Sequence, residues 1–162
     1  METATGEVID QATHTQVETL NDLIRINNDR VEGFEKAASD LEENDSDLKS
    51  LFSKFAQQSN SNVAELSSEV SKIGGVPQSG DSGPGGALHR AWIDVKALFT
   101  GHSRKSILEE CERGEDAIKK AYRDALSPEN GLSEEVAGIV GKQQLEINAA
   151  HDTIKGLRDS QA

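Results

Sequence analysis

Apolar residues recur every three or four positions over four long stretches of the chain, and polar or glycine-containing segments separate these stretches. Leu20, Ile24 and Phe34 mark the first stretch, Leu51, Phe55 and Leu66 the second, Ile107, Ile118 and Tyr122 the third, and Val136, Ile147 and Ile154 the fourth. This spacing is that of one face of an α-helix. It predicts four amphipathic helices that bury their apolar stripes against one another in a bundle.

Residues typical of helix caps and turns stand between the stretches. They are Thr15 and Glu18 in a capping-box pattern, Asn44–Asp47, Gly74-Gly75, Ser103, Ser127–Gly131, and Ser133. The first helix is therefore expected to begin at Thr15. The turns near residues 45 and 129 are short, so each joins two helices that must be antiparallel neighbours.

The connection between the second and third long helices differs from the others. Residues 74–86 are rich in glycine and proline, and residues 87–99 have the spacing of a short amphipathic helix. Together they can span a whole bundle length, which lets the third long helix run parallel to the second. The predicted fold is all-α, a ferritin-like four-helix bundle with one long crossover that contains a short extra helix. Residues 1–14 are expected to be a disordered tail, and residues 15–160 one domain.

Composition and charge narrow the possible functions. Of the 162 residues, 17 are basic and 29 acidic, giving a net charge of −12 that would repel nucleic acid or an anionic membrane. Neither a secretory signal nor an apolar run of the roughly 20 residues needed for a membrane helix is visible. The single cysteine, Cys111, fits a reducing compartment and lies on an apolar stripe. We expect a cytoplasmic protein whose partners are proteins or copies of itself.

Counting outward from the two short turns gives an estimate of which residues face one another. Asn27 is expected to face Asn62, and Glu112 to face Glu146, near the middle of the bundle. Glu65 and Glu115 lie within a helical turn of that level, as does Gln143. Glu65, Glu112, Glu115 and Glu146 are therefore candidate ligands for iron or another divalent cation. The alternative is a polar layer of Asn, Gln and Glu, in which Arg113, Lys119 and Lys142 neutralise the acids or the acids lie at the solvent edge.

The histidines argue against a di-iron centre. Di-iron bundles take a Glu-x-x-His motif from each of two helices. The residues three positions before His14, His89, His102 and His151 are Gln11, Gly86, Phe99 and Asn148. Asn27 and Asn62 are also neutral where carboxylates would be needed. His151 and Glu35 lie at similar distances from the same end of the bundle, so they are expected to meet as a polar pair.

Several sequence blocks carry a family resemblance. They are Asn21–Ile24, Gly33-Phe34, Ala64–Leu66, Gly74–Pro77, Ala87–Trp92, Glu109–Asp116 and His151-Asp152. With these blocks the chain resembles a ferritin-like, four-helix-bundle family of uncharacterised bacterial proteins that carries a domain of unknown function. It is similar, more distantly, to ferritins and rubrerythrins, and Glu112, with Glu65 and Glu146, falls on matching metal-site positions. The resemblance implies a ferritin-like bundle and no established activity.

The sequence therefore leads to two hypotheses. The first is a non-catalytic helical bundle with a role in stress or as an interaction module, with no cofactor. The second is a metal-dependent oxidoreductase or metal-storage bundle that uses the four candidate glutamates. The missing Glu-x-x-His motif favours the first hypothesis.

Overall fold

The computed structural model describes residues 10–78 and 103–161 of the chain. In these residues the long elements are α1 (Gln11–Asp40), α2 (Ser46–Lys72), α4 (Arg104–Ala125) and α5 (Glu134–Asp159), and η2 (Glu43–Asp45) and η3 (Pro128–Asn130) are short 3-10 helices. The predicted all-α fold is confirmed. The short helix expected at residues 87–99 lies outside the described residues. None of the helices in the described ranges combines the length and apolar character that a membrane span requires.

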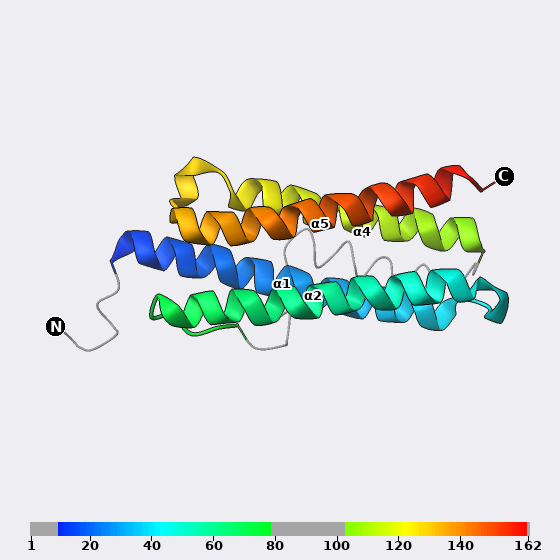
Figure 1. Ribbon diagram of the computed structural model, residues 1–162, viewed down its shortest axis with the longest axis horizontal. Coiled ribbons are helices and arrows are strands. Elements are labelled where there is room, and N and C mark those ends of the chain that lie inside the picture. The colour runs from blue at the N-terminus through cyan, green and yellow to red at the C-terminus, as the bar shows by residue number, and fades with distance from the viewer. Residues whose placement is uncertain (1–9, 79–102, 162) are drawn as a thin grey trace.

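The helices pack as two antiparallel hairpins, α1 with α2 and α4 with α5 (Figure 1). In Figure 1 both α2 and α4 run from right to left as the residue number rises, so the predicted parallel arrangement is confirmed. Arg104, at the start of α4, bonds Asp45 at 3.0 Å and Asp47 at 2.7 Å, at the start of α2. These ion pairs hold the beginnings of the two parallel helices at the same end of the molecule.

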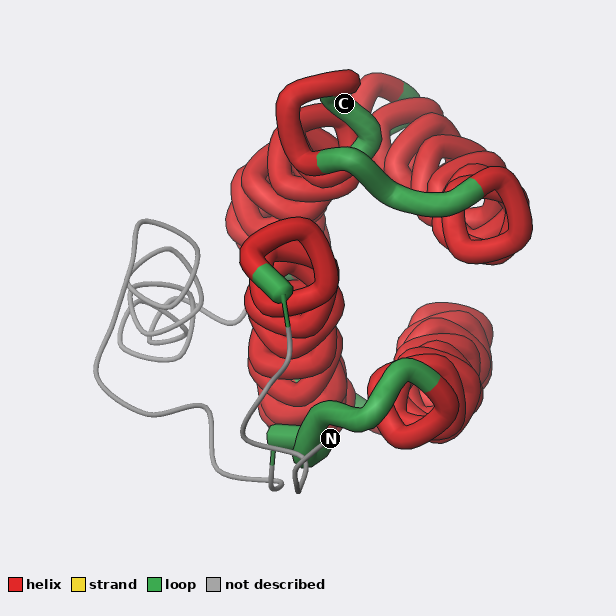
Figure 2. Tube along the Cα trace, turned by 90° about the vertical axis from the view of Figure 1, so that its left-hand side faces the viewer, coloured by secondary structure: helices red, strands yellow, loops and turns green. Residues whose placement is uncertain are grey.

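The core lies between the two hairpins and consists mostly of aliphatic side chains. Its largest fully buried apolar members are Phe34, Phe52, Tyr122, Leu20, Leu23, Ile24, Leu48, Leu66, Ile107 and Leu108. Helix α1 packs on both α2 and α4, whereas α5 packs mainly on α4 and only slightly on α2. The end-on view in Figure 2 accordingly shows the long helices arranged around a common axis, with a larger separation between neighbouring helices on one side. Burial of these apolar stripes, rather than helix propensity, supplies most of the stability of such a bundle.

The predicted start of the first helix is wrong by one turn. Helix α1 begins at Gln11, because the side chain of Asp10 caps it by accepting a hydrogen bond from the Thr13 backbone N–H at 2.8 Å. That bond also lowers the pKa of Asp10. Ser103 and Ser133 cap α4 and α5 in the same way, as predicted.

The end of α2 brings it close to the start of α1. Gly74 adopts a left-handed conformation with φ of 90°, and the Gly75 N–H donates to the Val70 carbonyl at 2.9 Å. A Cβ atom at Gly75 would lie only 2.7 Å from the Val17 side chain. The paired glycines therefore both end the helix, as predicted, and allow close packing of the hairpin.

Candidate functional site

A buried arginine occupies the middle of the bundle. Arg30 on α1 and Glu115 on α4 are both 0% exposed, and Arg30 donates from Nε and Nη2 to the two carboxylate oxygens of Glu115 at 2.8 and 2.9 Å. The remaining guanidinium nitrogen donates to Gln58 at 2.8 Å and to Ser59 at 2.9 Å. This is the bidentate geometry in which an arginine–carboxylate pair is strongest. The ion pair joins α1 to α4, and the bonds to Gln58 and Ser59 join α1 to α2.

Two aromatic rings pack against the same guanidinium. Its central carbon lies 5.2 Å from the centroid of the Phe34 ring and 5.5 Å from that of Phe55. Both distances are within the range of a cation–π interaction. The charge of Arg30 is thus stabilised by hydrogen bonds to oxygen atoms and by contact with the faces of two aromatic rings.

A second hydrogen-bond network centres on Tyr122 of α4 and connects all of the long helices in the described residues. Asn27 donates to the Tyr122 hydroxyl at 2.8 Å, and that hydroxyl donates to Gln143 at 2.7 Å. Gln143 donates onward to Glu65 at 2.7 Å, and Asn62 donates to Asn27 at 3.2 Å. Burial raises the pKa of Tyr122 well above its ordinary value, so its hydroxyl remains a neutral donor.

These contacts show where the residues predicted for the middle of the bundle lie. The expected facing of Asn27 and Asn62 is confirmed by their hydrogen bond. Glu115 is buried in this layer, but its neutralising partner is Arg30 rather than Arg113, Lys119 or Lys142. Sequence reasoning missed Arg30. The signal was its place on the apolar stripe, three residues after Asn27 and four before Phe34, where a solvent-facing arginine would not be expected.

A separate polar cluster lies between α4 and α5. Glu112 and Asp116 are one turn apart on α4, and His151 on α5 faces them. His151 Nε2 lies 2.6 Å from Asp116 and 3.8 Å from Glu112. One donor atom from each residue lies within 4.8 Å of the other two, so the group could hold a metal ion.

Charged neighbours surround this cluster. Arg158 forms an ion pair with Glu112 and another with Asp159 at 2.8 Å. On the far side of the His151 ring, Nδ1 lies 3.3 Å from Asp152 and 3.5 Å from the Lys119 ammonium. Glu112 and His151 therefore each have a charged neighbour outside the group, while the exposed Asp116 contacts His151.

Two predicted contacts are not what the structure shows. Glu146 is exposed on α5, and Glu112 pairs with Arg158 and His151 instead of facing it. Near the end of α4, Tyr122 already lies beside Gln143, well inside α5, so the helices are offset relative to a simple reflection through the turn. Glu35 is exposed on α1, and its expected pairing with His151 is wrong because α5 packs on α4, whose carboxylates take that place.

Comparison with known protein families assigns most of the chain to one family. Residues 15–128 match the DUF2383 family, which is described as a domain of unknown function. The chain belongs to the DUF2383 family. In this DUF2383 chain the matched range covers Arg30, Glu112, Glu115 and Asp116, while His151 lies beyond it. A comparison with curated proteins found no match.

The cysteine of this DUF2383 chain is a core residue. Cys111 is fully buried on α4, and its pKa is raised well above the ordinary value by burial and further by the charges of Glu115 and Glu110. A thiol in such surroundings is a poor nucleophile, because the thiolate is the reactive form. Cys111 therefore packs as a small apolar side chain, as its position on the apolar stripe predicted.

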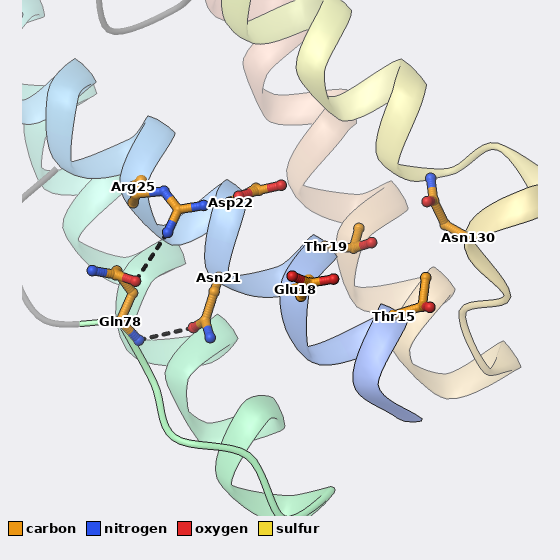
Figure 3. A pocket seen from close by; sticks show the side chains of 8 residues that line it. All are labelled: Thr15, Glu18, Thr19, Asn21, Asp22, Arg25, Gln78 and Asn130. Atoms are coloured by element: carbon orange, nitrogen blue, oxygen red, sulfur yellow. Dashed lines mark hydrogen bonds and ion pairs between the residues drawn. The ribbon is translucent and has the colours of Figure 1, made fainter. Parts of the chain in front are cut away.

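A polar surface pocket lies beside the first half of α1 (Figure 3). It measures about 420 Å³ and is lined by Thr15, Glu18, Thr19, Asn21, Asp22, Arg25, Gln78 and Asn130. Arg25 donates to Gln78 at 3.0 Å and is paired with Asp22. Asn21 accepts from the Gln78 backbone N–H at 2.8 Å. These groups tie the segment after α2 to α1, and they are already engaged with one another.

Proposed function

We propose that this DUF2383 protein is a ferritin-like four-helix bundle that lacks a di-iron centre and acts in the cytoplasm as a non-catalytic interaction module. The observation that carries this proposal is the buried Arg30–Glu115 ion pair in the middle of the bundle. Ferritin-like di-iron proteins place carboxylate-bound metal ions between the same facing helices. Here the positive charge of that layer belongs to the protein itself.

The residues of the central layer do not fit a pair of iron ions. A di-iron site needs four carboxylates and two imidazoles around it. Glu115 is the carboxylate that contacts Arg30 in this layer, and both of its oxygens accept from the guanidinium. The buried side chains that share hydrogen bonds in this layer also include the neutral groups of Asn27, Asn62, Ser59, Tyr122 and Gln143. A dication pair would be repelled by the guanidinium and poorly compensated by neutral oxygens.

The hydrogen bonds of the layer support a structural role for it. Arg30 and Tyr122 each bond partners on two other helices, so a shift in register between the helices would leave buried polar groups unpaired. Such a network favours one packing arrangement over others. The buried polar residues then serve to fix the packing of the helices, and the surface residues carry the function. With 17 basic and 29 acidic residues, that surface suits a protein partner or a second copy of the chain better than nucleic acid or an anionic membrane.

Iron content and oxidase activity test the proposal. Tag-free protein from iron-supplemented cells should carry less than a full pair of iron atoms per chain by elemental analysis. It should oxidise Fe(II) no faster than a protein-free control, because Arg30 occupies the layer. Stoichiometric iron at two atoms per chain, lost together with an oxidase activity on Glu115→Gln, would overturn the proposal.

A second candidate function is metal binding outside the centre. The observation that favours it is the group of Glu112, Asp116 and His151, which offers an imidazole and two carboxylates at one place. Iron or another divalent cation could be held there without the paired-metal geometry of a ferroxidase. This candidate concerns different residues from the central layer, so it can be tested separately.

A further inference from the structure

The imidazole of His151 is buried without a hydrogen bond on one side. The residue is 6% exposed, and its Nε2 atom has no hydrogen-bond partner in the described residues. Asp116 Oδ1 approaches that nitrogen to 2.6 Å, but not along the direction in which an N–H group would donate. An ordinary histidine–carboxylate pair would align the N–H with the oxygen. Within the described part of the chain, the Nε2 atom is therefore left without a hydrogen bond although two carboxylates lie 2.6 and 3.8 Å from it.

The three side chains have the donor types and spacing of a small metal site. A divalent ion bound at about 2.0–2.2 Å from each ligand keeps its ligand atoms roughly 3–4 Å apart. Glu112 Oε2 is already 3.8 Å from His151 Nε2, and the 2.6 Å approach of Asp116 has to open by a small side-chain rotation. Asp116 is free to make that rotation, since its side chain is 62% exposed. The same exposure leaves a path for the ion and room for water ligands.

The neighbours of the cluster match the outer contacts of metal ligands. A metal-bound histidine commonly donates its other ring N–H to a carboxylate, and a metal-bound carboxylate is itself hydrogen-bonded. Asp152 lies 3.3 Å from His151 Nδ1 and can accept that proton. Arg158 holds the Oε1 atom of Glu112, which leaves Oε2 facing His151. Both outer partners can keep their contacts when an ion binds between the ligands.

We propose that His151 Nε2, Glu112 Oε2 and Asp116 Oδ1 bind one divalent transition-metal ion of the zinc class, with water completing its coordination. One imidazole with two carboxylates suits Zn²⁺, Co²⁺ or Ni²⁺, whereas Mg²⁺ and Ca²⁺ prefer oxygen ligands alone. The Lys119 ammonium, 3.5 Å from His151 Nδ1, opposes the positive ion. The affinity is therefore lower than the ligands alone would give.

Titration of the chelator-treated, tag-free protein tests the site. Co²⁺ should bind with one ion per chain and give a visible d–d spectrum, which Zn²⁺ abolishes and an equal concentration of Mg²⁺ or Ca²⁺ does not. Asp116→Asn should weaken Zn²⁺ binding at least about tenfold, and His151→Ala at least about a hundredfold, since even outer-shell changes cost about 10–100-fold. Lys119→Met should tighten binding, because it removes the opposing charge.

Matched controls change the same residue types outside the site, and the aspartate control lies on the same helix as Asp116. Asp124→Asn removes an exposed carboxylate of α4 that pairs with Lys120 at 2.8 Å, and His14→Ala removes an exposed histidine 3.5 Å from Glu18. Both should leave Zn²⁺ binding unchanged. Because Asp116 is exposed, its variant keeps the fold, which circular dichroism will verify.

The metal proposal is overturned if no ion binds, or if binding survives both Asp116→Asn and His151→Ala. It is also overturned if Mg²⁺ and Ca²⁺ compete equally with Zn²⁺. None of these results bears on the central layer. Conversely, a pair of iron ions lost on Glu115→Gln would contradict the proposed function and leave the α4–α5 site standing.

Discussion

Removing one partner of the central ion pair should strongly destabilise the bundle. Arg30→Met keeps the apolar stem of the side chain but leaves the Glu115 carboxylate at 0% exposure, with no donor to either oxygen from the part of the chain that the structure describes. Ser59 loses its donor as well. Breaking a buried pair in this way costs about 3–5 kcal/mol, because an uncompensated charge stays in the interior. Glu115→Met should cost a similar amount by leaving the guanidinium without its carboxylate.

The double variant Arg30→Met with Glu115→Met separates this explanation from simple loss of packing. When both charges are replaced by apolar groups, no buried charge remains, and such replacements are often close to neutral. The double variant should therefore be no less stable than either single variant. Independent packing losses would instead add to about 6–10 kcal/mol.

Urea unfolding followed by far-UV circular dichroism measures these differences in stability, provided that the slope of the unfolding free energy against urea concentration is the same for all variants. Arg25→Met is the matched control, because Arg25 lies on the same helix but is partly exposed and paired with Asp22 and Gln78. It should change stability by no more than about 1 kcal/mol. Single variants of Arg30 and Glu115 that cost less than this control, or single costs that add in the double variant, would refute the reasoning.

Three other outcomes are expected from the structure. Tyr122→Phe should cost about 1–3 kcal/mol in the same assay, because Gln143 loses its donor; an unchanged midpoint would contradict the network. Cys111 should resist thiol reagents in the native protein and react in urea, since burial raises its pKa; fast native labelling would show that it is accessible. The Arg104 hydrogen bond lowers the pKa of Asp47 from 3.8 to about 2, so the stability it contributes is present above pH 3.8 and lost as pH falls toward 2. Asp47→Asn should therefore lower Tm near neutral pH and reduce its fall over that range, and an identical acid profile would argue against the ion pair.

Local chemistry made much of the fold predictable. Ser103, Ser133 and Gly74 were assigned as helix ends because capping depends on a few neighbouring residues, and the structure agrees. The start of α1 was misplaced because Asp10 and Thr15 are both capping residue types, and the choice between them depends on how far the helix can extend. The parallel course of α2 and α4 followed from the length of their connection.

Contacts within the first hairpin were also predictable, whereas those within the second were not. Asn27 and Asn62 could be paired by counting from the short connection through η2. The same counting failed for Glu112 and Glu146. The connection through η3 lets α5 begin beyond the end of α4, so the two helices are offset along their length. A shift of this size moves a residue by more than a helical turn and changes its partners.

The sequence by itself determined the helices, the caps of α4 and α5, and the presence of polar residues on the apolar stripes, because these depend on spacing and neighbouring residues. Only the tertiary structure decided that Arg30 neutralises Glu115, since the partners come from different hairpins and are 85 residues apart in sequence. It likewise brought His151 of α5 to Glu112 and Asp116 of α4. Ion pairs and metal sites are set by the offset and rotation of one helix against another, and the interlocking of all the buried side chains fixes both.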